Sequence, residues 1–139
     1  MKVYIDTSVV LRRMLQQPGA IEHWSQWDLA VSSTLMQVEV FRTLDRLRLK
    51  GKLADSEVAD LVGLLLGLAS GLEQIPVQPS VLQRASSPFP TAIGTLDAIH
   101  LATALLWVED NGENLTFLTH DRQLAIAARA CGLQTRVPS

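Results

Sequence analysis

The chain has 139 residues, of which 47% are hydrophobic and 19% are charged. This length and composition predict one soluble globular domain with a packed core. The formal net charge of −2 does not by itself indicate a nucleic-acid-binding protein, and the single cysteine, Cys131, argues against disulfides, redox chemistry and a structural zinc site.

The chain shows no pattern typical of membrane insertion or export. Its most apolar stretch, 61–72, contains three glycines and a serine. It is far shorter than the roughly 20 residues that span a bilayer. Lys2 is followed at once by a strand pattern and Asp6, instead of the apolar segment of a signal peptide. We therefore expect a cytoplasmic protein.

Strand and helix patterns alternate along the chain. Short runs rich in β-branched residues predict strands at 2–6, 29–33, 74–77, 115–119 and 133–137. Helices are predicted at 8–16, 21–27, 34–49, 57–69, 80–85, 96–108 and 122–131. This alternation predicts an α/β protein with a parallel sheet and right-handed crossovers.

Turn and capping residues mark several helix ends. Pro18 and Gly19 end the first helix. The expected capping residues are Gly51, Asp55 or Ser56, Thr95 and Gly132. Because the connection between helices 34–49 and 57–69 is short, we expect these two to form an antiparallel hairpin.

Four acidic residues follow strand ends or lie on helices that come after them. They are Asp6, Glu39, Asp97 and Asp121. The carboxyl ends of parallel strands meet at one edge of a sheet, which is the usual ligand site in such folds. Carboxylates about 4 Å apart repel by roughly 4 kcal/mol per pair at an effective dielectric of 20. A divalent metal that prefers oxygen ligands would relieve this repulsion.

Each acid also has a structural explanation. Asp6 and Asp121 are suited to capping the helices that follow them, and Asp97 lies in a first turn, where the helix dipole favours an anion. Glu39 could pair with Arg42, three residues later. Asp97, however, falls in an apolar helical sector, away from a more polar stripe that includes His100. Taken jointly, the four positions favour a shared site over independent capping.

Neighbouring polar residues are weaker candidates. Thr7, Ser8 and Thr119 stand next to the acids, where they could hydrogen-bond the carboxylates or simply serve in turns. The three histidines share no ligand spacing and are given no metal role. Basic residues concentrate along one predicted helix and its exit, at Arg42, Arg46, Arg48, Lys50 and Lys52. These residues could attract phosphate, but a solvated helix face explains them equally well.

The four acidic segments together resemble a known family. They are residues 3–8 (VYIDTS), 39–42 (EVFR), 95–104 (TLDAIHLATA) and 119–124 (THDRQL). In this order and spacing they are similar to PIN-domain ribonucleases, specifically the VapC toxins of bacterial toxin–antitoxin pairs. The resemblance spans nearly the whole chain and implies one PIN domain over residues 1–139. The implied fold has three layers, with a parallel sheet of about five strands flanked by helices.

The resemblance implies an activity and partners. Asp6, Glu39, Asp97 and Asp121 would form an acidic quartet that binds Mg²⁺ or Mn²⁺, with Asp6 and Asp97 as central ligands. The protein would be an endoribonuclease and a homodimer, neutralised by a cognate VapB-type antitoxin. Segment 80–94 carries no motif of the family. A magnesium-binding receiver-like signalling domain and a catalytically silent binding module are the alternatives.

Overall fold

The computed structural model describes residues 1–138, in which five parallel strands form one sheet of order β3-β2-β1-β4-β5. The strands are β1 (Lys2–Ile5), β2 (Leu29–Ser33), β3 (Glu73–Ile75), β4 (Thr116–Leu118) and β5 (Gln134–Arg136). The central strand β1 pairs with β2 and β4, with Ile5 opposite Leu118. The strand order changes direction between β1 and β4, so their carboxyl ends flank the point where ligands bind in open α/β sheets.

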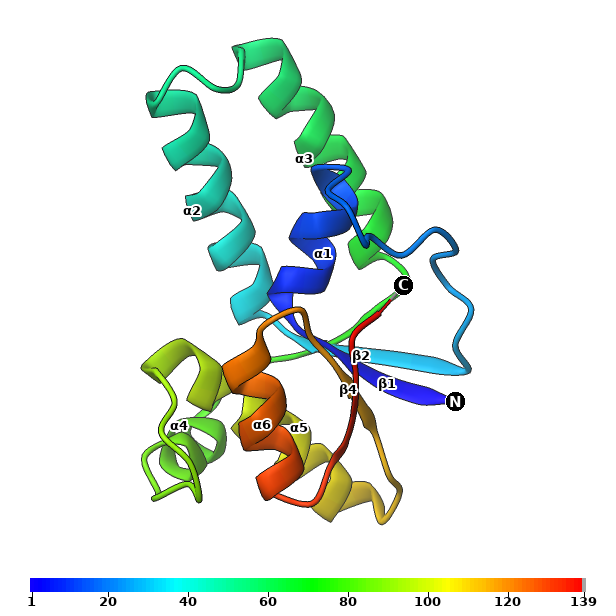
Figure 1. Ribbon diagram of the computed structural model, residues 1–139, viewed down its shortest axis with the longest axis vertical. Helices are drawn as coiled ribbons and strands as arrows, with labels where there is room; N and C mark the ends of the chain where they lie inside the picture. The colour runs from blue at the N-terminus through cyan, green and yellow to red at the C-terminus, as the bar shows by residue number, and fades with distance from the viewer. Residues whose placement is uncertain (139) are drawn as a thin grey trace.

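Within residues 1–138, six helices cover the two faces of the sheet (Figure 1). They are α1 (Thr7–Met14), α2 (Leu35–Leu49), α3 (Asp55–Ala69), α4 (Pro79–Ala85), α5 (Thr95–Asn111) and α6 (Arg122–Ala130). Figure 1 shows α1, α2 and α3 on one side of the sheet and α4, α5 and α6 on the other. The α2 and α3 helices form the antiparallel hairpin that the sequence predicts.

The alternation of side chains along β1 divides the core into two clusters. Val3 and Ile5 belong to the cluster with α1, α2 and α3, whereas Tyr4 belongs to the cluster with α5 and α6. All three side chains are fully buried. This is the period-two pattern of a strand that is covered on both faces. Within residues 1–138, no helix is both long and apolar enough to cross a membrane.

The predicted helix at 21–27 is wrong, because this segment is irregular. The guanidinium of Arg13 donates to the carbonyl oxygens of Ile21 (2.7 Å) and Glu22 (3.0 Å). A helix would use these same acceptors for its own N–H groups. Ser25 also adopts a φ of 69°, which a helix does not allow.

Two helix starts differ from the predicted capping residues. The N-cap of α3 is Ala54, whose backbone N–H donates to the Glu57 carboxylate at 3.0 Å. Gly94 is the N-cap of α5, so Thr95 is the first helical residue and not the cap. At the other ends, Gly51 and Gly132 follow α2 and α6 with φ of 72° and 91°, a conformation in which glycine terminates helices without strain.

Candidate active site

The four acidic residues line one cavity of about 410 Å³ at the carboxyl edge of the sheet. Asp6 follows β1, Glu39 lies on α2, Asp97 is in the first turn of α5, and Asp121 precedes α6. The rest of the wall is formed by the start of α1, by α2 from Leu35 to Arg46 and by the start of α5. Segments that are far apart in the sequence therefore deliver carboxylates to the same place, as their positions after strands predict.

Asp6 is oriented by two hydroxyl groups. Its Oδ2 atom accepts hydrogen bonds from Ser8 Oγ (2.7 Å) and Thr119 Oγ1 (2.8 Å). The residue occupies the N-cap position of α1, yet its side chain forms no capping hydrogen bond. Simple helix capping therefore does not explain this carboxylate, which is only 5% exposed. The two hydroxyls fix its orientation at the base of the cavity.

Glu39 does not form the ion pair with Arg42 that was the alternative explanation for this residue. That guanidinium contacts Asp45 instead, at 3.2 Å. Glu39 Oε1 accepts a hydrogen bond from Thr7 Oγ1 (2.7 Å) and lies 2.5 Å from His100 Nε2. Burial raises the pKa of Glu39, but the hydrogen bonds from His100 and Thr7 outweigh it, so that its pKa is below the usual value. Glu39 is thus ionised and held toward the interior.

His100 is the residue of this site that the sequence interpretation missed. It is 1% exposed, and its Nδ1 lies 2.7 Å from the Tyr4 hydroxyl. Burial lowers the pKa of His100, but the hydrogen bond with Glu39 and the charges of Asp6 and Glu39 outweigh burial and raise it. The sequence did carry a signal, because His100 lies three residues after Asp97 and so on an adjacent part of the helix surface. The side of α5 that carries His100 therefore faces the protein interior and adjoins the acidic site.

Asp97 and Asp121 repel each other electrostatically. Burial raises the pKa of Asp97, and the charges of Asp121 and Asp6 raise it further, to about 6. Asp121 also caps α6, because its Oδ1 accepts a hydrogen bond from the backbone N–H of Leu124 at 3.0 Å. The capping explanation is correct for this residue, but it does not exclude a second role, since the same carboxylate lines the cavity.

The donor set fits a hard divalent cation, since carboxylate oxygens from four segments face one cavity and already perturb one another. Among residues 1–138, however, no three His, Cys, Asp or Glu side chains are already grouped closely enough to hold one ion. Glu39 is held by His100, and Asp121 uses one oxygen to cap α6. Binding an ion would therefore require side-chain rotations that bring the carboxylates together.

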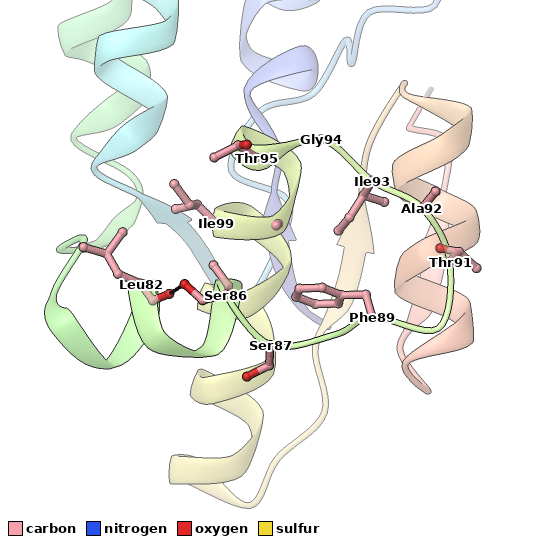
Figure 2. Close-up of a pocket in the computed structure, with 12 residues that line it drawn as sticks. Leu82, Ser86, Ser87, Phe89, Thr91, Ala92, Ile93, Gly94, Thr95 and Ile99 are labelled. Atoms are coloured by element: carbon pink, nitrogen blue, oxygen red, sulfur yellow. Dashed lines mark hydrogen bonds between the residues drawn. The ribbon is translucent and has the colours of Figure 1, made fainter.

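A second cavity, of about 480 Å³, is enclosed by α4, the following loop and the start of α5 (Figure 2). This is the segment 80–94 to which the sequence assigned no role. Phe89 and Ile93 point into the cavity, and hydroxyl groups of Ser86 and Thr95 lie at its wall. No carboxylate of the described residues lines this cavity, so we place the chemistry in the acidic cavity.

The basic residues near the acidic cavity are largely occupied. Arg42 and Arg46 line it, but Arg42 pairs with Asp45 and Arg46 donates to the Thr43 hydroxyl at 3.3 Å. Elsewhere, Arg12 donates to the carbonyl oxygen of Pro18 at 3.3 Å. These contacts support local structure, and the ion pair with Asp45 partly offsets the positive charge of Arg42 beside the carboxylates.

The chain is similar to known proteins in sequence and in fold. The family model described as "PIN domain" matches residues 3–130. Ribonuclease VapC47 of Mycobacterium tuberculosis is 30% identical over 143 residues, which cover 98% of this chain and 96% of that protein. A toxin–antitoxin complex from Klebsiella pneumoniae has a chain of similar fold, with a TM-score of 0.66, 15% identity and coverage of 99% and 98%. For VapBC2 from Rickettsia felis the TM-score is 0.67, the identity 14% and both coverages 98%. The expected three-layer fold with a parallel sheet is thereby confirmed.

Proposed function

The chain belongs to the PIN-domain family, and on that premise we propose that it is a metal-dependent endoribonuclease that acts in the cytoplasm as the toxin of a toxin–antitoxin pair. The observation that carries this proposal is the single cavity into which four separate segments bring Asp6, Glu39, Asp97 and Asp121. Ribonuclease VapC47, to which the chain is similar over nearly its whole length, supports RNA as the substrate.

In the proposed mechanism, Asp6 and Asp97 would hold Mg²⁺, or Mn²⁺ in its place, and Asp121 would complete the site from the α6 side. When bound, the cation would polarise the RNA phosphate and promote ionisation of the attacking water. Ser8 and Thr119 keep Asp6 in a fixed orientation. Glu39, ionised and bonded to Thr7 and His100, either completes the metal site or accepts the proton of the water.

The proposed partners are a second copy of the chain and a cognate VapB-type antitoxin. Solved toxin–antitoxin complexes share this fold. The α2–α3 hairpin also exposes large apolar side chains, including Val38 (57%), Phe41 (43%) and Leu66 (60%). Such apolar surface is typical of protein interfaces. Since Val38 also lines the acidic cavity, a partner that covers the hairpin would obstruct access to the carboxylates.

The direct test is incubation of the purified protein with total bacterial RNA in Mg²⁺, in Mn²⁺ and in excess chelator. The Asp97→Asn variant tests the site, and Lys52→Gln, which removes one charge of the opposite sign outside the cavity, is the control. We expect discrete metal-dependent cuts by the wild type and Lys52→Gln that Asp97→Asn lacks. Equal cleavage by Asp97→Asn would refute the assigned site. No cleavage by the wild type would favour a silent binding module.

A further inference from the structure

A third cavity, of about 460 Å³, lies beside the acidic one, between α6 and β5. Its polar and charged lining includes Thr119, His120, Asp121, Arg122, Arg129 and Arg136. Asp121 lines both this cavity and the acidic one, so the two are neighbours that share one wall. Figure 1 shows α6 beside the last strand, close to the end of the chain.

The chain geometry places the three arginines around this cavity. Arg122 and Arg129 are seven residues apart, or about two helical turns, and therefore lie on the same face of α6. Ala125 and Ile126 line the cavity between them, and the small Ala125 leaves room above the helix. Arg136 comes from β5, on the other side. Two elements thus contribute guanidinium groups to one hollow.

The charge of this cavity is opposite to that of its neighbour. Three guanidinium groups line it with one carboxylate, whereas four carboxylates and two guanidinium groups line the acidic cavity. In the described part of the chain, Arg122, Arg129 and Arg136 form no ion pair or side-chain hydrogen bond. By contrast, Arg48 pairs with Asp45 and Arg84 with Glu109. The positive charges of these three arginines are therefore not offset by ion pairs within the described part of the chain.

His120 also has unused hydrogen-bonding capacity. Its two ring nitrogens are shielded from solvent and have no hydrogen-bond partner within residues 1–138. An imidazole ring presents at least one N–H donor in either protonation state. Unpaired buried polar atoms are costly, and a ring rotation toward the cavity would let a bound anion satisfy the donor.

We propose that this basic cavity, lined by Arg122, Arg129 and Arg136, binds a backbone phosphate of single-stranded RNA next to the phosphate that is cleaved. This inference rests on the proposed function. The substrate strand would run from the acidic cavity across Asp121 to α6 and β5. Guanidinium groups suit this role because their planar donors match phosphate oxygens in pairs.

The electrostatics of the protein explain why such a site is needed. The chain is acidic overall, and four carboxylates at the reaction site repel an approaching polyanion. The three unpaired arginines of the neighbouring cavity would offset this repulsion and, on binding, release counterions from the RNA backbone. Arg42 contributes less because Asp45 partly neutralises it. The positive surface that guides the strand is therefore on the α6 side of the site.

The test is RNA binding in excess chelator, where no metal-dependent cleavage occurs. A fluorescein-labelled random-sequence 12-nucleotide RNA is titrated with wild type, Arg122→Gln, Arg129→Gln, Arg136→Gln and the triple variant, over a series of KCl concentrations. Fluorescence anisotropy gives the Kd, and thermal melts verify that each variant is folded. The exposed Lys52→Gln is the charge-matched control.

Each arginine substitution should raise the Kd about 3- to 10-fold and reduce the slope of log K against log salt by about 0.7. Arg129→Lys should recover part of the affinity, because it keeps the charge but loses the paired donors. Lys52→Gln should bind like the wild type. An unchanged Kd and salt slope in the folded triple variant would overturn the inference, as would an equal loss in Lys52→Gln.

The outcome is separable from that of the nuclease assay. If the wild type cleaves RNA in a metal-dependent way but the triple arginine variant binds RNA with an unchanged Kd, the proposed function stands and the phosphate site is rejected. Arginine-dependent RNA binding by a protein that never cleaves RNA would support the phosphate site and reject the nuclease.

Discussion

Replacing Asp97 by asparagine should stabilise the metal-free protein at pH 8. Burial and the charges of Asp121 and Asp6 raise the pKa of Asp97 to about 6, against 3.8 in an unfolded chain. This difference corresponds to about 3 kcal/mol when the carboxylate is ionised. Because Asp97 is only half buried, solvent screening reduces the effect to about 1–2 kcal/mol. The amide forgoes some interaction with the α5 dipole, so a net gain of about 1 kcal/mol remains.

The pH dependence of this gain follows from the direction of the pKa change. A folded pKa above the unfolded one means that native Asp97 binds extra protons between about pH 4 and 6. The contribution of this proton binding to the stability of the wild type is complete below pH 3.8 and is lost as the pH rises through about 6. The advantage of Asp97→Asn should therefore be largest at pH 8 and should fall to zero or below at pH 4.5.

Urea denaturation in chelator at the two pH values measures this difference, and other titrating groups largely cancel between wild type and variant. Mg²⁺ at 100 times its Kd should then stabilise the wild type by about 2.7 kcal/mol and the variant by less. A variant that is less stable than the wild type at pH 8 would refute the reasoning. So would a difference that does not change with pH, since either result would assign Asp97 a structural role.

Three further predictions concern the residues around Asp97. His100→Asn should destabilise the protein by about 2–3 kcal/mol in urea denaturation at pH 6, because it leaves Tyr4 and Glu39 without their buried partner. Since the pKa of His100 is raised, this cost should be full below pH 6.5 and decline as the pH rises through the folded pKa; a constant cost would show that the charge of His100 contributes nothing. Ser8→Ala should lower Mn²⁺ affinity about 10- to 100-fold in calorimetry while costing about 1 kcal/mol of stability, and unchanged affinity would exclude an orienting role toward Asp6. Asp121→Ala should lose about 1 kcal/mol of stability that Asp121→Asn retains, because only the alanine removes the cap of α6. RNA cleavage should fall in both Asp121 variants, and a loss confined to the alanine would reduce Asp121 to its capping role.

The strands were predictable because their burial follows the simple rules of parallel sheets. Each predicted strand agrees with an observed one to within two residues at either end. The segment 21–27 failed for a reason that local pattern cannot reveal, since a side chain from α1, Arg13, binds the carbonyl groups that a helix would need. The cap of α3 was missed because the Glu57 side chain reaches back to the N-cap N–H of Ala54, which has no capping side chain.

The acidic positions were also predictable, since the carboxyl ends of β1 and β4 must lie side by side once the sheet is parallel. Their hydroxyl neighbours were candidates too, since Thr7, Ser8 and Thr119 adjoin the acids in the sequence, but the contact with His100 was not predictable. The Glu39 contact with His100 joins α2 to α5 across 61 residues, and only tertiary packing decides that His100 faces inward. The arginines of α6 and β5 were overlooked for the same reason, because they share a cavity only after the last helix folds back onto the sheet.

The central claim is that the four carboxylates together bind a divalent cation, and Mn²⁺ binding followed by electron paramagnetic resonance tests it most directly. Wild type, Asp6→Asn, Glu39→Gln, Asp97→Asn and Asp121→Asn are compared with Lys52→Gln. We expect binding by wild type and Lys52→Gln, the greatest losses in Asp6→Asn and Asp97→Asn, and smaller losses in the other two. Absence of binding by the wild type, or equal binding by all variants, would contradict the metal site.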